Sequence, residues 1–192
     1  MTVQMQGGVQ LRKALREFEP DLAKSLQKEM QTALKPIVTK ARGFIPDQSP
    51  LRNWKSQSRG RWPVYDVGLM RRGISFKTSP TKPNSSGFSY LASIHNKTAS
   101  GAIFETAGRT NPSGQPWAGP RKNVGQKRYS HSNNPTAGAN FISRLPIMYG
   151  QGKKRGRAIY KAWAMDQGRA NSAVLKALQN AANQYRLKRG TF

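Results

Sequence analysis

The side chains that enzymes use for catalysis are scarce and widely spaced in this 192-residue chain. Beyond residue 30 the acidic residues are Asp47, Asp66, Glu105 and Asp166, and they form no recurring motif. Acid–base chemistry or metal-assisted hydrolysis needs paired carboxylates, or a nucleophile with a base beside it. The sequence therefore predicts no catalytic residues and no enzymatic activity, and it argues against a metal-dependent nuclease.

Two histidines and one glycine-rich turn remain as candidate ligand sites. His95 falls in an expected strand and His131 in a polar segment, and the chain has no cysteine to complete a zinc site. We interpret both as hydrogen-bonding or exposed histidines. Residues 150–156 contain a Gly-Lys pair, but a P-loop needs Ser or Thr after that pair and a strand before it. We expect neither a bound metal nor a cofactor.

Positive charge is the strongest feature of the sequence. The chain carries 33 Lys and Arg against 8 Asp and Glu, a formal net charge of +25, and nearly all of the excess lies beyond residue 30. Such a field favours a polyanion or an acidic protein surface nearby. The candidate contacts to DNA or to a partner form two clusters: Arg121, Lys122, Lys127, Arg128, Lys153, Lys154, Arg155 and Arg157.

These cations have three interpretations. They neutralise nucleic-acid phosphates, they face acidic surfaces of protein partners, or they are solvated. The sequence has no helix-turn-helix, zinc-finger, RRM or KH signature, so binding to nucleic acid would be independent of base sequence. The alternative function is therefore a non-specific basic nucleic-acid-binding protein of ribosomal or nucleoid type.

Residues 90–109 hold the candidate inter-subunit contacts. Glu105 is flanked by Phe104 and Ala107 in an otherwise basic chain, which suggests an edge or interface position. Two interpretations stay open: an ion pair with Arg109 or Arg71 of another copy, or a solvent-facing strand residue. Trp117, in the segment that follows, is a further candidate for an inter-subunit contact.

The hydrophobic pattern predicts an α+β domain spanning residues 1–192. Apolar residues at spacings of three and four predict helices over residues 9–18 and 20–42, the second kinked at Pro36. Alternation or short apolar runs predict strands over residues 73–78, 88–95 and 102–106, forming an antiparallel meander. We expect the long N-terminal helix to pack on this sheet and a C-terminal helix, interrupted near Gly168, to close the domain.

Three segments lack such a pattern. Residues 47–67 form a loop whose Trp54, Trp62 and Tyr65 either stack on bases or pin the loop to the core or to a neighbour; we favour pinning. Residues 110–140, rich in Gly and Pro, predict a long extended arm that becomes ordered only against partners. Residues 187–192 predict a flexible tail.

The order of these parts resembles the head–tail connector proteins of long-tailed bacteriophages, which include neck, tail-completion and tail terminator proteins. The similar motifs are KPIVTKARGFIP at the end of the long helix, Gly68, Leu69 and Ile74 at a strand start, IFETAG, and a C-terminal helix within residues 156–185. They cover most of residues 11–185 in the family's order. The arm over residues 110–140 is longer than the usual turn of that family.

The resemblance implies a structural virion protein without a catalytic site. It would form an oligomeric ring, commonly a hexamer, that joins the capsid connector to the tail tube and surrounds the DNA channel. The implied partners are other copies of the chain, neck proteins on the portal or adaptor side, the tail tube protein, and packaged DNA. Because the sequence shows neither a signal peptide nor a membrane-spanning run, we expect synthesis in the host cytoplasm and a place in the virion.

Overall fold

The computed structural model describes residues 8–51, 54, 63–79, 90, 92–120 and 132–189. Some sequence-based candidates lie outside this part of the chain: Trp62, Arg121, Lys122, Lys127, Arg128 and His131. Residues 88, 89 and 91 of the expected strand over residues 88–95, and residues 190–192, also lie outside it.

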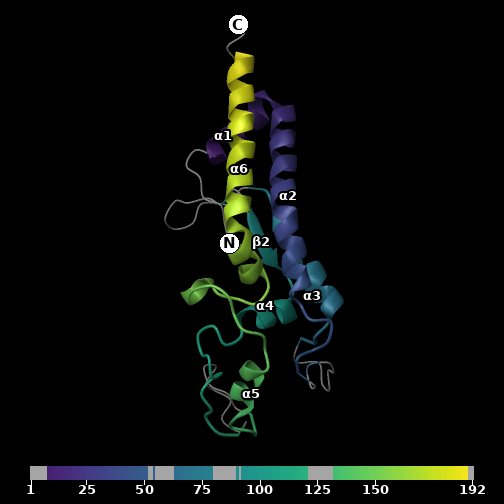
Figure 1. Ribbon diagram of the computed structural model, residues 1–192, viewed down its shortest axis with the longest axis vertical. Coiled ribbons are helices and arrows are strands. Elements are labelled where there is room, and N and C mark those ends of the chain that lie inside the picture. The colour runs from purple at the N-terminus through teal and green to yellow at the C-terminus, as the bar shows by residue number, and fades with distance from the viewer. Residues whose placement is uncertain are drawn as a thin grey trace.

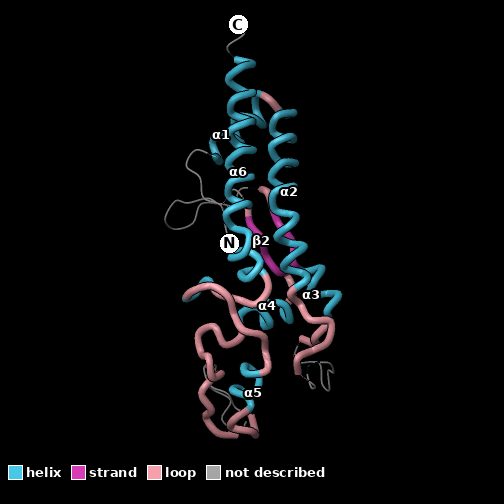
Figure 2. Tube along the Cα trace, viewed as in Figure 1, coloured by secondary structure: helices cyan, strands magenta, loops and turns pink. Residues whose placement is uncertain are grey.

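The described residues form a mixed helical and sheet structure in which helix dominates (Figures 1 and 2). The six α-helices and two strands assigned there are α1 (Gly8–Phe18), α2 (Pro20–Gly43), α3 (Val67–Gly73), β1 (Ile74–Lys77), β2 (Ser93–Asn96), α4 (Ala99–Thr106), α5 (Ala137–Ser143) and α6 (Ile159–Arg189). A 3₁₀ turn, η2 (Gly152–Lys154), precedes α6. An α+β class is therefore confirmed in outline.

Helices α2 and α6 form the long axis of the molecule and run antiparallel, side by side (Figure 1). Pro20 suits the first turn of α2, where its missing N–H is not needed, and Asp21 beside it and Lys40 and Arg42 in the last turn suit the helix dipole. The helix continues through Pro36 for 24 residues, or about 36 Å at 1.5 Å per residue. The expected bounds of the first two helices are thus confirmed.

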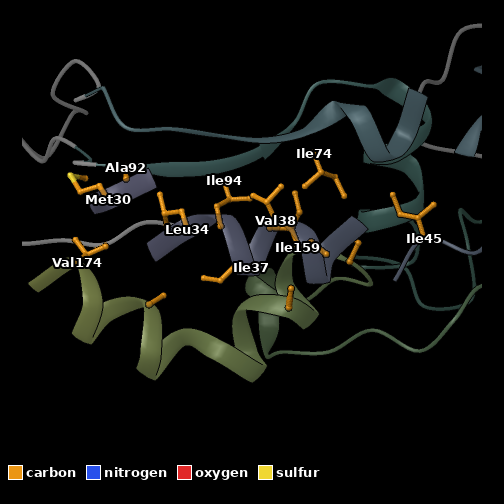
Figure 3. Packing of buried hydrophobic residues seen from close by; sticks show 14 of the residues in the cluster. Met30, Leu34, Ile37, Val38, Ile45, Ile74, Ala92, Ile94, Ile159 and Val174 are labelled. Atoms are coloured by element: carbon orange, nitrogen blue, oxygen red, sulfur yellow. The ribbon is translucent and has the colours of Figure 1, made fainter. Parts of the chain in front are cut away.

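The hydrophobic core lies where α2 meets both the sheet and α6. Leu34, Ile37 and Val38 of α2 are buried, as are Ile94 of β2 and Val174 of α6. Figure 3 shows these side chains in one continuous row between the elements. Replacing such a residue by alanine typically costs about 2–5 kcal/mol of stability, so this row holds the two long helices and the sheet together.

The three-stranded meander is wrong for the described residues. Their sheet has two antiparallel strands, with Phe76 opposite Ile94. The third expected strand, residues 102–106, belongs to helix α4, which begins where the Thr98 hydroxyl accepts a hydrogen bond from the Gly101 N–H at 3.2 Å. A short apolar run fits a strand or a buried helix equally well, and here the N-terminal cap selects the helix.

Two further expectations are corrected. Gly68 and Leu69, which the resemblance placed at a strand start, lie in helix α3, which the Asp66 carboxylate caps by accepting from the Leu69 N–H at 2.8 Å. Helix α6 has no interruption at Gly168 and extends for 31 residues into the expected tail. A helical glycine costs about 1 kcal/mol, which the burial of Ala170 and Val174 in the next turns offsets.

Candidate partner and nucleic-acid interface

Glu105 caps helix α6 from a distant part of the chain. Its side chain is only 5% exposed, and its carboxylate accepts hydrogen bonds from the N–H groups of Ala158 at 2.7 Å, Ile159 at 3.2 Å and Tyr160 at 2.9 Å. The first N–H groups of a helix have no partner within it, and the positive end of the helix dipole attracts an anion. Glu105 therefore fixes where α6 begins and how it sits against α4.

This position corrects one interpretation of Glu105. The residue lies on a helix, buried, and is not a solvent-facing strand residue. Both carboxylate oxygens are already engaged within the chain. An inter-subunit ion pair with Arg109 or Arg71 stays a prediction, but it is not needed to hold the carboxylate.

Arg157 is a second buried residue where α4 meets the start of α6, and we call it and Glu105 the buried centre. Its guanidinium donates to the carbonyl oxygens of Pro146 at 2.6 Å, Phe104 at 2.9 Å and Ala107 at 2.8 Å, and the residue is 4% exposed. Burial lowers the pKa of Arg157, and the charge of Glu105 opposes this shift. We expected Arg157 among the contacts to DNA or a partner, but its side chain is buried and ties the end of α4 to the start of α6.

Residues 150–155, which we call the basic turn, stand on this centre. The backbones of Tyr149 and Gly156 pair on either side of it, with N–H···O distances of 2.8 and 2.9 Å. Gly150 has φ of 102°, and a Cβ there would lie 2.3 Å from the Lys154 carbonyl oxygen. A Cβ on Gly156 would lie 2.2 Å from the Glu105 Oε1. Glycine at these positions lets the turn close tightly against the buried carboxylate.

The basic turn presents two cations to solvent and holds a third. Lys153 and Lys154 are exposed. The Arg155 guanidinium donates to the Arg109 carbonyl oxygen at 2.6 Å. Arg109 itself lies over the Tyr160 ring, 4.7 Å from its centroid. The structure therefore brings Lys153, Lys154, Arg155 and Arg109 into one neighbourhood, as the spacing of the first three already implied.

Apolar side chains accompany these cations. Ile147 is 83% exposed and Tyr149 is 42% exposed. The Lys161 ammonium lies 4.5 Å from the centroid of the Tyr149 ring and 4.2 Å from that of Phe44. An exposed aliphatic residue two positions before an aromatic ring that holds a lysine offers a partner apolar area near positive charge. Ile147 was not among the sequence-based candidates; the short apolar stretch over residues 141–148, before the glycine-rich turn, was the signal that could have found it.

The aromatic residues of the first loop pin it in place. Trp54 contacts Tyr65 and Phe141, with ring centroids 5.1 and 5.6 Å apart, and its indole N–H donates to the Pro63 carbonyl oxygen at 2.9 Å. Tyr65 is buried and its hydroxyl donates to the Pro46 carbonyl oxygen, so burial raises the pKa of Tyr65 to about 12. The favoured interpretation is confirmed for Trp54 and Tyr65.

The expected arm is partly folded at its two described ends. Gly114 has φ of 82°, and a Cβ there would lie 2.5 Å from the backbone of Gly138, so the two ends of the arm touch. Trp117 is 43% exposed, and its indole N–H donates to the Ser132 carbonyl oxygen at 2.8 Å. From Ala137 the chain is helical rather than extended. Inter-subunit contact through Trp117 stays a prediction.

His95 and Asp47 have partners elsewhere in the fold. His95 lies with its Nε2 2.9 Å from the Ser75 hydroxyl; burial, then Lys97 and Lys77, lower the pKa of His95. Asp47 pairs with Arg71 at 2.8 Å.

No three His, Cys, Asp or Glu side chains in the described part of the chain are grouped to hold a metal ion. Among the same residues, no helix combines the length and apolar character needed to cross a membrane.

No protein-family model matches the chain, and the comparisons found no curated protein and no solved structure similar to it.

Proposed function

We propose that this protein is a structural subunit of the head–tail junction of a long-tailed phage. In this proposal copies of the chain form a ring that joins the capsid connector to the tail tube, and the DNA passes through the ring. The virion would be its final location. The chain would act as a tail terminator or as a head–tail joining protein.

One observation carries the proposal: a basic turn with an exposed apolar neighbour is built on the buried, hydrogen-bonded pair Glu105 and Arg157. Glu105 and Arg157 hold the base of the turn through six hydrogen bonds to backbone groups. Lys153 and Lys154 stand at its tip. A cationic turn with its base held in this way suits an assembly contact or a DNA channel, because its backbone loses less conformational entropy on binding.

The net charge of +25 supports DNA as a neighbour. It also favours the second candidate function, a non-specific nucleic-acid-binding protein of ribosomal or nucleoid type. The two differ in assembly: the first forms rings of its own, whereas the second acts as a monomer with high affinity for free nucleic acid.

The experiment measures binding to a 30-base-pair DNA duplex as a function of salt. The logarithm of the binding constant falls as the logarithm of the salt concentration rises, and each phosphate contact steepens this slope by roughly one unit. The slope measured for the Lys153→Ala/Lys154→Ala variant should therefore be shallower by up to about two units. The matched control, Lys13→Ala/Lys97→Ala, removes the same charge from exposed sites elsewhere. An equal loss of slope in both variants would contradict a role for the basic turn. Native mass spectrometry of the same samples separates ring from monomer.

A further inference from the structure

A groove of about 810 Å³ runs between α2 and α6. These two helices lie side by side over most of their length (Figure 1). Short or compact side chains line the groove from both helices: Ala33, Pro36, Ile37, Ala170, Ala173 and Ala177. Because these side chains do not fill the space between the helices, a larger apolar side chain from outside can pack there.

The rim of the groove is predominantly cationic. Lys28 on α2, and Arg169 and Lys176 on α6, are exposed and line it. At one end Lys40 pairs with Asp166, with 2.6 Å between Nζ and Oδ2. Glu29 is the other acidic residue in the lining, so positive charge exceeds negative. The groove therefore fits an occupant that is apolar at its centre and acidic at its edges.

The chain itself carries one such surface. Residues 17–21, with the sequence EFEPD, hold three acidic residues in five positions without a cation, and we call them the acidic knob. They form the corner between α1 and α2, and Phe18 at the centre is 56% exposed. Glu19 pairs with Lys188 at 2.7 Å and Asp21 with Lys24 at 3.4 Å. Such exposed pairs are typically weak and can be exchanged for others.

We propose that the acidic knob of one copy docks in the α2/α6 groove of the next copy. Phe18 would pack on the alanine floor while Glu17 and Asp21 approach the cations of the rim. Two chains of +25 repel each other in general, but at physiological salt charges interact mainly within about 8 Å, so local complementarity decides the contact. An acidic helix from another protein is the alternative occupant and would leave the knob uninvolved.

Knob and groove are different surfaces, and in our proposal each copy places its knob in the groove of the next, so the contact is heterologous and repeats from copy to copy. Repetition with a suitable rotation closes a ring. The inference thus rests on the proposed function, since it names the surfaces through which the ring would form.

The test compares self-association by sedimentation velocity at 0.15 M salt. Phe18→Ala removes the apolar centre of the knob, and Lys28→Glu/Lys176→Glu reverses the rim; each should weaken association at least tenfold. Glu17→Lys is a second knob variant, and a cation in the last turn of α1 is favourable to that helix, so it should fold. Lys13→Glu/Lys97→Glu, the matched charge control, should associate like the unmodified protein apart from a small general loss of repulsion.

A mixture gives a sharper readout. Phe18→Ala retains an intact groove and Lys28→Glu/Lys176→Glu retains an intact knob, so the two together should form heterodimers and nothing larger. Because the chain has no cysteine, Phe18→Cys/Ala173→Cys should yield a ladder of dimers, trimers and higher species on oxidation, whereas Lys97→Cys/Ala173→Cys should not.

The outcomes separate this inference from the proposed function. If the unmodified protein forms rings that the knob and rim variants leave intact, the ring stands and the knob-in-groove contact is overturned. If an acidic partner helix protects the groove while copies do not associate, the alternative occupant replaces the knob. If the unmodified protein stays monomeric at every concentration, the contact is again overturned, and the ring of the proposed function falls with it, while the DNA titration still tests the basic turn.

Discussion

Removing the Glu105 carboxylate should destabilise the protein more than removing any other helix cap described above. Glu105→Ala leaves the N–H groups of Ala158, Ile159 and Tyr160 without their acceptor and takes the neighbouring charge from buried Arg157. Loss of one ordinary N-cap costs about 0.5–2 kcal/mol, and loss of one partner of a buried charge costs about 3–5 kcal/mol. We expect a loss of about 3–5 kcal/mol in the free energy of unfolding.

The assay is urea unfolding followed by circular dichroism, with Asp66→Ala as the matched control. Asp66 also caps a helix, but it is exposed and accepts one backbone hydrogen bond, so its loss should cost about 1 kcal/mol. Hydrogen exchange should show the largest loss of protection at the first amides of α6 in Glu105→Ala. Equal destabilisation by the two substitutions would refute the idea that Glu105 organises the start of α6.

Three further predictions use single substitutions and the same unfolding assay. Gly156→Ala should lower the free energy of unfolding by at least about 2 kcal/mol, because its Cβ would meet the Glu105 carboxylate at 2.2 Å. A Cβ on Gly168 has nothing within 4 Å, so Gly168→Ala should raise the free energy of unfolding by up to about 1 kcal/mol. A change of the same sign in both variants would contradict this. The pKa of Tyr65 is raised to about 12 in the folded protein, so the unfolded chain loses this proton first as the pH rises above 10. The stability of the protein should therefore fall between pH 10 and 12. Tyr65→Phe, which has no such proton, should lose less stability over that interval. The lowered pKa of His95 means that the unfolded chain binds its proton first, so stability should fall as the pH drops below about 6.5, and His95→Gln should flatten that dependence.

The helices with an apolar repeat and strand β1 could be predicted from the sequence, whereas the short helices α3 and α4 were not. The repeat in α2 extends over six turns, and Pro20 marks its start, so both its existence and its bounds followed. Helix α4 has eight residues, too few for its periodicity to exclude a strand. Asp66 and Thr98 stand where an N-cap is expected, so attention to capping residues could have identified α3 and α4.

The candidate site was only partly visible in the sequence. The rarity of acidic residues singled out Glu105, but its partners lie more than 50 positions further along the chain, and no local pattern links them. In the sequence Arg157 cannot be told apart from the exposed basic residues beside it, because its burial depends on the folded chain. Lys153 and Lys154 are exposed as the sequence suggested, because no apolar period surrounds them.

The central proposal, that the finished form of this protein is a DNA-encircling ring, is tested most directly by native mass spectrometry of the purified chain with and without duplex DNA. Discrete closed oligomers at micromolar concentration, with one duplex retained per oligomer, are the predicted result. A folded monomer that neither associates nor binds the duplex would contradict it.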